Sequence, residues 1–514
     1  MLLKILVLIV FFGIMILVGV NARKKVNGVN DFVLGGRNVG PWVCAFSFGT
    51  SYFSAVVFIG YAGQFGWKFG IASTWIGIGN ALIGSMLAWV ILGRRTRVMT
   101  NHLSSSTMPD FFGKRYGSKA LKIAASAIAF VFHIPYTASV YNGLSKLFGL
   151  AFDIPYEAVV IGMAVLTGVY VILGGYMASS MNDFIQGMIM LVGMVAVIAS
   201  VITKQGGFTE ALVKLSNVQS PETADQPGVF ASFFGPDPAG LLSVVILTSL
   251  GTWGLPQMVQ KFYAIKSEKS IKTGTIVSTF FAIIIGGGSY FMGGFGRLFG
   301  GEGASFINAE TGAVAYDGIV PAMLQNSLSD ILIGVVVVLV LSASMSTLSA
   351  LVLTSSSTLT LDLLKDNVIK NMDQKKQMFV MRIMIVFFVV VSVIIALDPP
   401  TAIAQLMGIS WGALAGAFLA PFLYGLYWKK VTRPAVWASF IASIVITVGN
   451  LFVKVTASPI VAGAAAMIVG LIIVPIVSVI TKNPQADKNR IENIFECYNV
   501  HVTVKKSIQI SAEC

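Results

Sequence analysis

The sequence predicts an all-α integral membrane protein with about 13 transmembrane helices. Hydrophobic residues make up 56% of its 514 residues and charged residues only 11%, against roughly 25% charged residues in globular domains. The mean hydropathy is +0.82. Apolar windows of about 20 residues, the length that crosses a bilayer, recur along the chain.

The apolar windows define the expected spans in order. They lie at approximately 2-21, 42-64, 72-93, 121-146, 155-174, 181-202, 239-260, 273-296, 331-361, 379-397, 402-427, 434-453 and 459-480. The first resembles a signal peptide because Lys4 lies at its start. However, Arg23, Lys24 and Lys25 follow it without a small-residue cleavage site, so we expect a retained helix.

The net charge of +13 comes from short basic clusters between the spans. Such clusters indicate topology rather than nucleic-acid binding. They follow the odd-numbered spans, which predicts a cell-membrane protein with its N-terminus outside and its C-terminus in the cytoplasm. The predicted membrane domain covers residues 1-482, and the polar residues 483-514 are expected to form a cytoplasmic tail.

Two spans are interrupted by small residues and proline. One contains the segment from Ser47 to Ser54, and the other contains the segment from Thr248 to Pro256. Unwinding there would expose carbonyls and helix ends that bind ions and polar solutes, although glycine-mediated packing with a proline kink fits the same residues. With repeats at about 42-202 and 239-427, both breaks fall in the first helix of a repeat, as is typical of secondary transporters.

Hydroxyl side chains gather in the longest uncharged stretch. The 31 residues from Ile331 to Leu361 carry no charge, and five Ser and Thr residues lie between Leu341 and Ser349. Hydroxyls in the middle of a membrane helix fit a site for a dehydrated cation. They also fit interhelical packing, because Ser and Thr can bond to their own helix.

Asp183 is the carboxylate nearest to an apolar interior. Burying a charge is costly enough to predict a cation partner. The alternative is a helix cap, because Ser180 and Asp183 have the spacing of a capping box.

No enzyme or cofactor chemistry is indicated. The sequence has no GxxxxGK[ST] loop, and its three cysteines and three histidines have no metal-ligand spacing. His133, in an apolar span near Pro135, is expected to be packed or to line a cavity.

Four segments occur in the order known from one transporter family: 31-41, 174-186, 260-263 and 345-349. Over about residues 1-480 the chain resembles the sodium:solute symporter family, most closely its bacterial sodium/proline symporter branch. The resemblance implies a five-plus-five inverted-repeat core similar to that of the bacterial leucine transporter. It also implies alternating access, sodium as the coupling ion and import of a small organic solute, such as the amino acid proline.

The resemblance also implies a sodium site and a sodium pathway. The site would use the carbonyls of Thr50, Phe53 and Ala343 and the hydroxyls of Ser346 and Thr347. Neutral oxygen ligands suit a monovalent ion that must be released again. The pathway residues would be Asp183 on the exit route, Ser349, and Arg37 at the cytoplasmic entrance. Some relatives hold a second sodium with consecutive serines, but Ala350 follows Ser349 here, so one sodium per substrate is expected.

The substrate site implied by the resemblance comprises Ser51, Tyr52, Ser54, Tyr136, Trp253 and Pro256. It departs from the proline branch, which has an acid in place of Tyr52 and aromatic residues in place of Thr248 and Thr252. Pantothenate, a monocarboxylate, a sugar or an inorganic anion therefore remain alternative substrates. A sensor on the same core is a further alternative, although the tail is too short for a kinase module, and so is a passive channel. The expected partners are sodium, the solute and the lipid bilayer, without nucleic acid, and oligomeric state has no signal in the sequence.

Overall fold

The computed structural model describes residues 2-24, 26-152, 154-220, 223-301, 304-365, 367-456, 458-482 and 485-499. Over these ranges the chain is almost entirely helical and contains isolated β-bridges but no strand. The α-helices of the first half are α1 (Leu2–Arg23), α2 (Val29–Leu34), α3 (Pro41–Tyr52), α4 (Ala62–Phe69), α5 (Thr74–Gly79), α6 (Arg94–His102), α7 (Met108–Tyr116), α8 (Lys119–Phe152), α9 (Tyr156–Lys204) and α10 (Phe208–Ser216).

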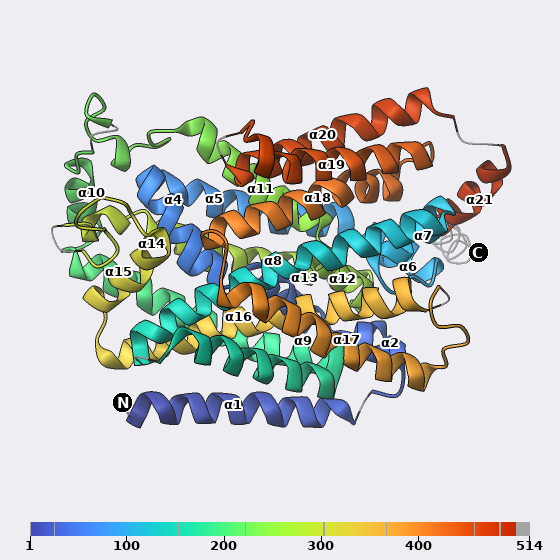
Figure 1. The fold of residues 1–514 in the computed structure, drawn as a ribbon, viewed down its shortest axis with the longest axis horizontal. Helices are drawn as coiled ribbons and strands as arrows, with labels where there is room; N and C mark the ends of the chain where they lie inside the picture. The colour runs from blue at the N-terminus through green and yellow to red at the C-terminus, as the bar shows by residue number, and fades with distance from the viewer. Residues whose placement is uncertain are drawn as a thin grey trace, which may run out of the picture.

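The second half continues in the same way. Its helices are α11 (Pro238–Gly254), α12 (Pro256–Ala264), α13 (Lys269–Ala282), α14 (Gly288–Gly293), α15 (Ile319–Ser327), α16 (Asp330–Thr358), α17 (Gln374–Leu397), α18 (Ile403–Tyr427), α19 (Arg433–Val453), α20 (Pro459–Ile480) and α21 (Gln485–Glu496). The long helices run roughly along one axis, with the N-terminus at one end and α21 at the other (Figure 1). The two ends of the described chain therefore lie on opposite sides of the bundle.

Nine helical stretches among the described residues are long and apolar enough to cross a membrane, or ten if the bent pair α11 and α12 is one span. Two of them, Val56–His102 with 47 residues and Tyr156–Lys204 with 49 residues, are about twice the length that a single crossing needs. The chain turns within each at a glycine with positive φ, Gly70 (+60°) and Gly175 (+54°), a conformation that side chains with a Cβ rarely adopt. Tyr156–Lys204 can thus hold two crossings. In the first stretch the residues before Gly70 are too few for a crossing of their own and continue the span that α3 begins. The count of 13 stays a prediction.

Both predicted interruptions are present. Helix α3 ends at Phe53, which has an extended backbone (φ −100°, ψ 101°). Helices α11 and α12 meet at an angle of 45° across the extended residue Leu255. Pro256 opens α12, and its ring and missing N–H prevent continuation of α11. The expectation of two broken helices is confirmed.

Helix α16 lies at the centre of the bundle. The apolar window of the helical stretch that contains it is 94% buried, whereas that of α17 is 33% buried. α16 packs against α3, α8, α9 and α17, so its hydroxyls face other helices rather than lipid. Its position places them beside the break of α3.

Part of the predicted tail is an ordered helix. Ile491, Ile494 and Phe495 of α21 are buried against the main core. Arg490 Nη1 donates to the carbonyls of Lys114 (3.1 Å) and Arg115 (3.0 Å). Helix α21 therefore packs on the core and contacts the end of α7. Cys514 lies outside the described residues.

We expect the substitution Phe495→Ala to release α21 from the bundle. Truncating a buried phenylalanine costs about 3 to 5 kcal/mol. This loss is large for a helix of 12 residues that is held by a few buried side chains. Limited proteolysis should cut the variant near α21 much faster than the wild type. Glu492→Ala, at an exposed position of the same helix, is the control. Equal cleavage rates of Phe495→Ala and the control would contradict this expectation.

Candidate functional site

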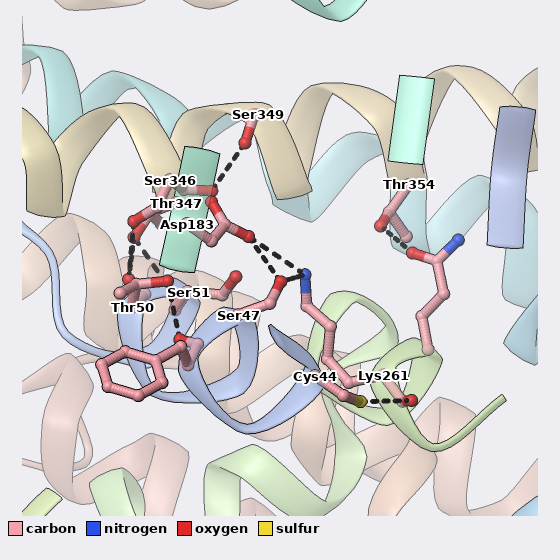
Figure 2. Close-up of polar contacts among 12 residues, drawn as sticks. Cys44, Ser47, Thr50, Ser51, Asp183, Lys261, Ser346, Thr347, Ser349 and Thr354 are labelled. Atoms are coloured by element: carbon pink, nitrogen blue, oxygen red, sulfur yellow. Dashed lines mark hydrogen bonds and ion pairs between the residues drawn. The ribbon is translucent and has the colours of Figure 1, made fainter. Parts of the chain in front are cut away.

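The break of α3 meets the middle of α16. Because α3 ends at this point, the carbonyls of its last residues are free of helical hydrogen bonds. Ser346 Oγ donates to the Thr50 carbonyl at 2.9 Å. Thr347 Oγ1 is 3.3 Å from the carbonyls of both Thr50 and Ser51 (Figure 2). Backbone oxygens from one helix and hydroxyl oxygens from the other thus converge in a buried position.

A carbonyl of α16 completes this group. The oxygen of Ala343 accepts from Ser346 Oγ at 2.9 Å and from Thr347 Oγ1 at 3.1 Å. Four of the five predicted sodium ligands, Thr50, Ala343, Ser346 and Thr347, are therefore connected by hydrogen bonds. Phe53, the fifth, occupies the break itself, and its ring stacks on Tyr52 with 4.3 Å between centroids.

The chemistry of this set fits sodium. All of its atoms are neutral carbonyl or hydroxyl oxygens, which are hard ligands without a fixed charge. In the described part of the chain no group of three or more His, Cys, Asp or Glu side chains is arranged to hold a metal ion. Ser344, another member of the hydroxyl cluster, fits the alternative of helix packing, because its hydroxyl donates to the Val340 carbonyl of its own helix.

Asp183 lies next to this set and has a cation partner. The Ser47 hydroxyl donates to Asp183 Oδ2, and Lys261 Nζ lies 3.8 Å from the same oxygen. Lys261 belongs to α12 and lies within one of the matched segments, yet the sequence analysis did not assign it a role. The predicted span ends at residue 260, which leaves Lys261 in the basic connection that follows. With the observed end of α12 at Ala264, Lys261 is the one charged residue of the broken helix pair.

The other two pathway residues differ in position. Ser349 is close to the set and donates to the Ser346 carbonyl at 2.9 Å. Arg37 instead donates to the carbonyls of Thr100, at the end of α6, and Ser105. Burial lowers the pKa of Arg37 from its usual range, and the neighbouring Arg97 adds to this effect. Of the three residues predicted for the pathway, Asp183 and Ser349 therefore lie beside the oxygen ligands and Arg37 lies apart from them; the pathway itself stays a prediction.

Aromatic side chains line the other side of the α3 break. The ring of Trp411, on α18, stacks against Tyr52 at 5.9 Å and meets Tyr136 edge-on at 5.8 Å. The Tyr52 hydroxyl donates to the Thr248 carbonyl at 2.7 Å and so connects the two broken helices. We call Tyr52, Tyr136 and Trp411 the aromatic cluster.

Two predicted serines, Ser51 and Ser54, flank Tyr52 in the chain. The Ser51 hydroxyl is buried and has no hydrogen-bond partner among the described residues. Ser54 Oγ accepts from the Val56 amide at 3.2 Å. Trp411 was missed by the sequence analysis because nothing in the apolar span 402-427 distinguishes it from a packing residue.

The residues predicted on the second broken helix have other contacts. Trp253 Nε1 donates to the Ile83 carbonyl at 3.0 Å, and Pro256 forms the start of α12. Thr252 donates to the Gly84 carbonyl at 2.8 Å. The indole N–H of Trp253 and the hydroxyl of Thr252 thus both donate to carbonyls of the helical segment 80-87.

His133 is a packed histidine, as expected. Its Nδ1 lies 2.8 Å from Ser355 Oγ and its Nε2 lies 3.0 Å from Gln257 Oε1. It connects α8, α16 and α12 and has no exposed surface.

A helical membrane bundle with two broken helices, whose freed carbonyls meet hydroxyls of a central helix, is a secondary transporter of the inverted-repeat type. The model of the "Sodium:solute symporter family" matches residues 32–442. The chain therefore belongs to the sodium:solute symporter family.

The relatives cover nearly the whole chain. The sequence is 29% identical over 501 residues to the osmoregulated proline transporter of Bacillus subtilis, covering 95% of this chain and 96% of that protein. It is 30% identical over 505 residues to the sodium/proline symporter of Staphylococcus aureus, covering 94% and 95%. The sodium/proline symporter of Escherichia coli is 30% identical over 443 residues, with 84% of each chain covered.

Solved structures share the fold. A Na+-coupled sialic acid symporter in a substrate-bound, outward-open state matches with a TM-score of 0.75 at 18% identity, covering 93% of this chain and 97% of that one. MhsT in complex with L-phenylalanine matches with a TM-score of 0.53 at 14% identity, covering 85% and 97%. The predicted all-α fold of the leucine-transporter type and the predicted family are confirmed, and the protein is a multi-pass membrane protein that acts as a sodium-coupled symporter.

Proposed function

We propose that this protein imports proline together with sodium across the cell membrane. The observation that carries the proposal is the convergence of α3 carbonyls and α16 hydroxyls directly beside the aromatic cluster. An ion site and a solute site that share the same break can be coupled to each other. Three relatives named for proline transport, two of them sodium/proline symporters, support this choice of substrate.

Sodium would bind to the carbonyls of Thr50, Phe53 and Ala343 and to the hydroxyls of Ser346 and Thr347. In the structure the two hydroxyls donate to carbonyls of α3 and α16. An ion between them would replace these hydrogen bonds with ligand contacts from both helices. Its binding would therefore fix α3 against α16 and select one arrangement of the break.

Proline has an apolar ring, a carboxylate and an ammonium group, and the neighbouring residues match these features. Tyr52, Tyr136 and Trp411 provide apolar faces for the ring. The unpaired hydroxyl of Ser51 can donate to the carboxylate. The carbonyls at the end of α3 form the negative end of a helix dipole and can accept from the ammonium. Tyr52 would thus offer an aromatic surface at the position where the proline branch has an acid.

The proposed orientation places α21 in the cytoplasm and the N-terminus outside. The basic residues Arg94, Arg95 and Arg97 of α6 lie at the end of the bundle that carries α21 (Figure 1), as the positive-inside rule requires of a cytoplasmic face. A sodium ion moving inward would then follow the membrane voltage. A voltage of 100 mV contributes about 2.3 kcal/mol per charge, enough for roughly 40-fold accumulation of a neutral solute.

Uptake of radiolabelled proline into proteoliposomes tests the proposal. We expect saturable uptake driven by an inward sodium gradient, no accumulation when potassium replaces sodium, and competition by unlabelled proline. The competitors should include pantothenate, a monocarboxylate, a sugar and an inorganic anion. Sodium-dependent uptake of one of these without proline uptake would reject proline, and uptake independent of sodium would reject symport.

A further inference from the structure

A buried ion pair joins three helices beside the proposed sodium site. Lys261 Nζ, on α12, lies 2.7 Å from Ser47 Oγ of α3 and 3.8 Å from Asp183 Oδ2 of α9. The side chains of Lys261 and Asp183 are 3% and 1% exposed. The ammonium also lies 5.1 Å from the ring centroid of Tyr176, within the range of a cation–π contact.

Each member of this pair requires the other. A single buried charge in a membrane interior is expensive, and removing one partner of a buried pair is strongly destabilising because the other charge is left uncompensated. The lysine backbone is fixed as well, because Cys44 Sγ donates to the Lys261 carbonyl at 3.2 Å. The pair is therefore a defined part of the structure rather than a chance contact.

Only one oxygen of the carboxylate is used. Asp183 Oδ2 contacts both Ser47 and Lys261. Asp183 Oδ1 is buried and has no hydrogen-bond partner among the described residues. The carboxylate can therefore take a further cation, or exchange its present one, without first losing a hydrogen bond at that oxygen.

The pair is close to the path of the transported ion. Figure 2 shows Asp183 between the hydroxyls of Ser346 and Thr347 on one side and the Lys261 ammonium on the other. Ser47, which contacts both charges, lies three residues before Thr50 on the same helix. An ion that leaves the α3 and α16 oxygens in this direction meets a carboxylate whose negative charge is already balanced.

We propose that Lys261 is a tethered cation that occupies Asp183 and competes with sodium for it. This inference rests on the proposed sodium coupling. A covalently attached ammonium is present at a high effective concentration, so it prevents a second sodium from remaining on the carboxylate. When a sodium ion passes, the ammonium can withdraw toward Ser47 and the Tyr176 ring and then return. Lys261 would thereby limit the protein to one bound sodium.

The substitution Lys261→Met tests this role because it keeps the length of the side chain and removes its charge. Sodium binding is measured on the purified protein without solute, with radioactive sodium and by thermal unfolding in sodium or potassium chloride. We expect one sodium in the wild type. In Lys261→Met we expect a second sodium that binds more weakly than the first, because Ala350 leaves this ion without one serine oxygen. The variant should unfold at a lower temperature than the wild type in potassium and regain more stability in sodium than the wild type does.

The double variant Lys261→Met with Asp183→Asn removes both charges. It should bind one sodium, and in potassium it should be more stable than Lys261→Met. If Lys261→Met alone does not fold, this comparison decides: a folded double variant supports the pairing, and an unfolded one contradicts it. Lys266→Met, at an exposed position five residues further on, is the control and should match the wild type.

Two results would overturn the inference. One is a folded Lys261→Met protein that binds the same number of sodium ions as the wild type. The other is a double variant no more stable in potassium than Lys261→Met. A wild type that binds no sodium has a different meaning, because it would reject the proposed sodium coupling itself. The measurement on the wild type thus distinguishes failure of the inference about Lys261 from failure of the proposed sodium coupling.

Discussion

Replacing Thr347 by alanine should strongly weaken the activation of transport by sodium. Thr347 Oγ1 lies within 3.3 Å of the carbonyls of Thr50, Ser51 and Ala343, so it stands at the centre of the proposed ligand set. Losing one oxygen that contacts a charge costs about 1.5 to 3 kcal/mol, or roughly 10- to 150-fold in affinity. We expect the half-saturating sodium concentration of proline uptake to rise by this factor.

Two further variants separate ligand loss from damage to the fold. Thr347→Ser retains the hydroxyl and should keep sodium activation close to that of the wild type. Ser357→Ala removes a buried hydroxyl of the same helix that bonds only to α16 carbonyls, and it should leave sodium activation unchanged. Normal sodium activation in a folded Thr347→Ala protein would show that the ion binds elsewhere.

The substitution Gly251→Ala should impair solute binding while leaving the ion site intact. A Cβ at this position of α11 would lie 2.5 Å from Trp411 Cε3, so the indole must move within the aromatic cluster. Overpacking of this kind costs about 1 to 3 kcal/mol, which corresponds to roughly 5- to 150-fold in affinity. The concentration of proline that gives half-maximal uptake should rise accordingly, whereas stabilisation by sodium should not change.

Gly168→Ala is a suitable control because its added Cβ would meet no atom within 4 Å. It should retain wild-type uptake of proline. Unchanged proline affinity in Gly251→Ala would mean that Trp411 does not contact the solute. A loss of sodium stabilisation in the same variant would mean that the clash spreads to α16 and that the two sites are not separable at this residue.

The sequence was sufficient to predict the features that follow from local chemistry. Apolar windows define the helices, and Gly, Ser and Pro mark the two breaks because these residues weaken or end a helix. Two of the five predicted oxygen ligands, Ser346 and Thr347, lie in a matched segment. The other three are backbone carbonyls, which need only the correct position in the chain. The sodium ligands and substrate residues themselves remain predictions.

The features that the sequence could not provide depend on side chains brought together across the fold. Lys261 and Asp183 are separated by 78 positions and belong to different helices, so the distance of 3.8 Å between them has no local signal. Trp411 resembles any tryptophan of an apolar span until α18 places it against Tyr52 and Tyr136. The same holds for α21, whose polar sequence does not reveal the surface on which it packs.

Two residues near the end of α3, only two positions apart, belong to the two proposed sites. The Thr50 carbonyl contacts the α16 hydroxyls, and Tyr52, two positions later, joins Trp411 and the Thr248 carbonyl. If sodium binding stabilises this arrangement of the α3 backbone, it therefore also stabilises the arrangement that binds the solute. Thermodynamic linkage then requires reciprocity: if sodium strengthens the binding of proline by some factor, proline must strengthen the binding of sodium by the same factor.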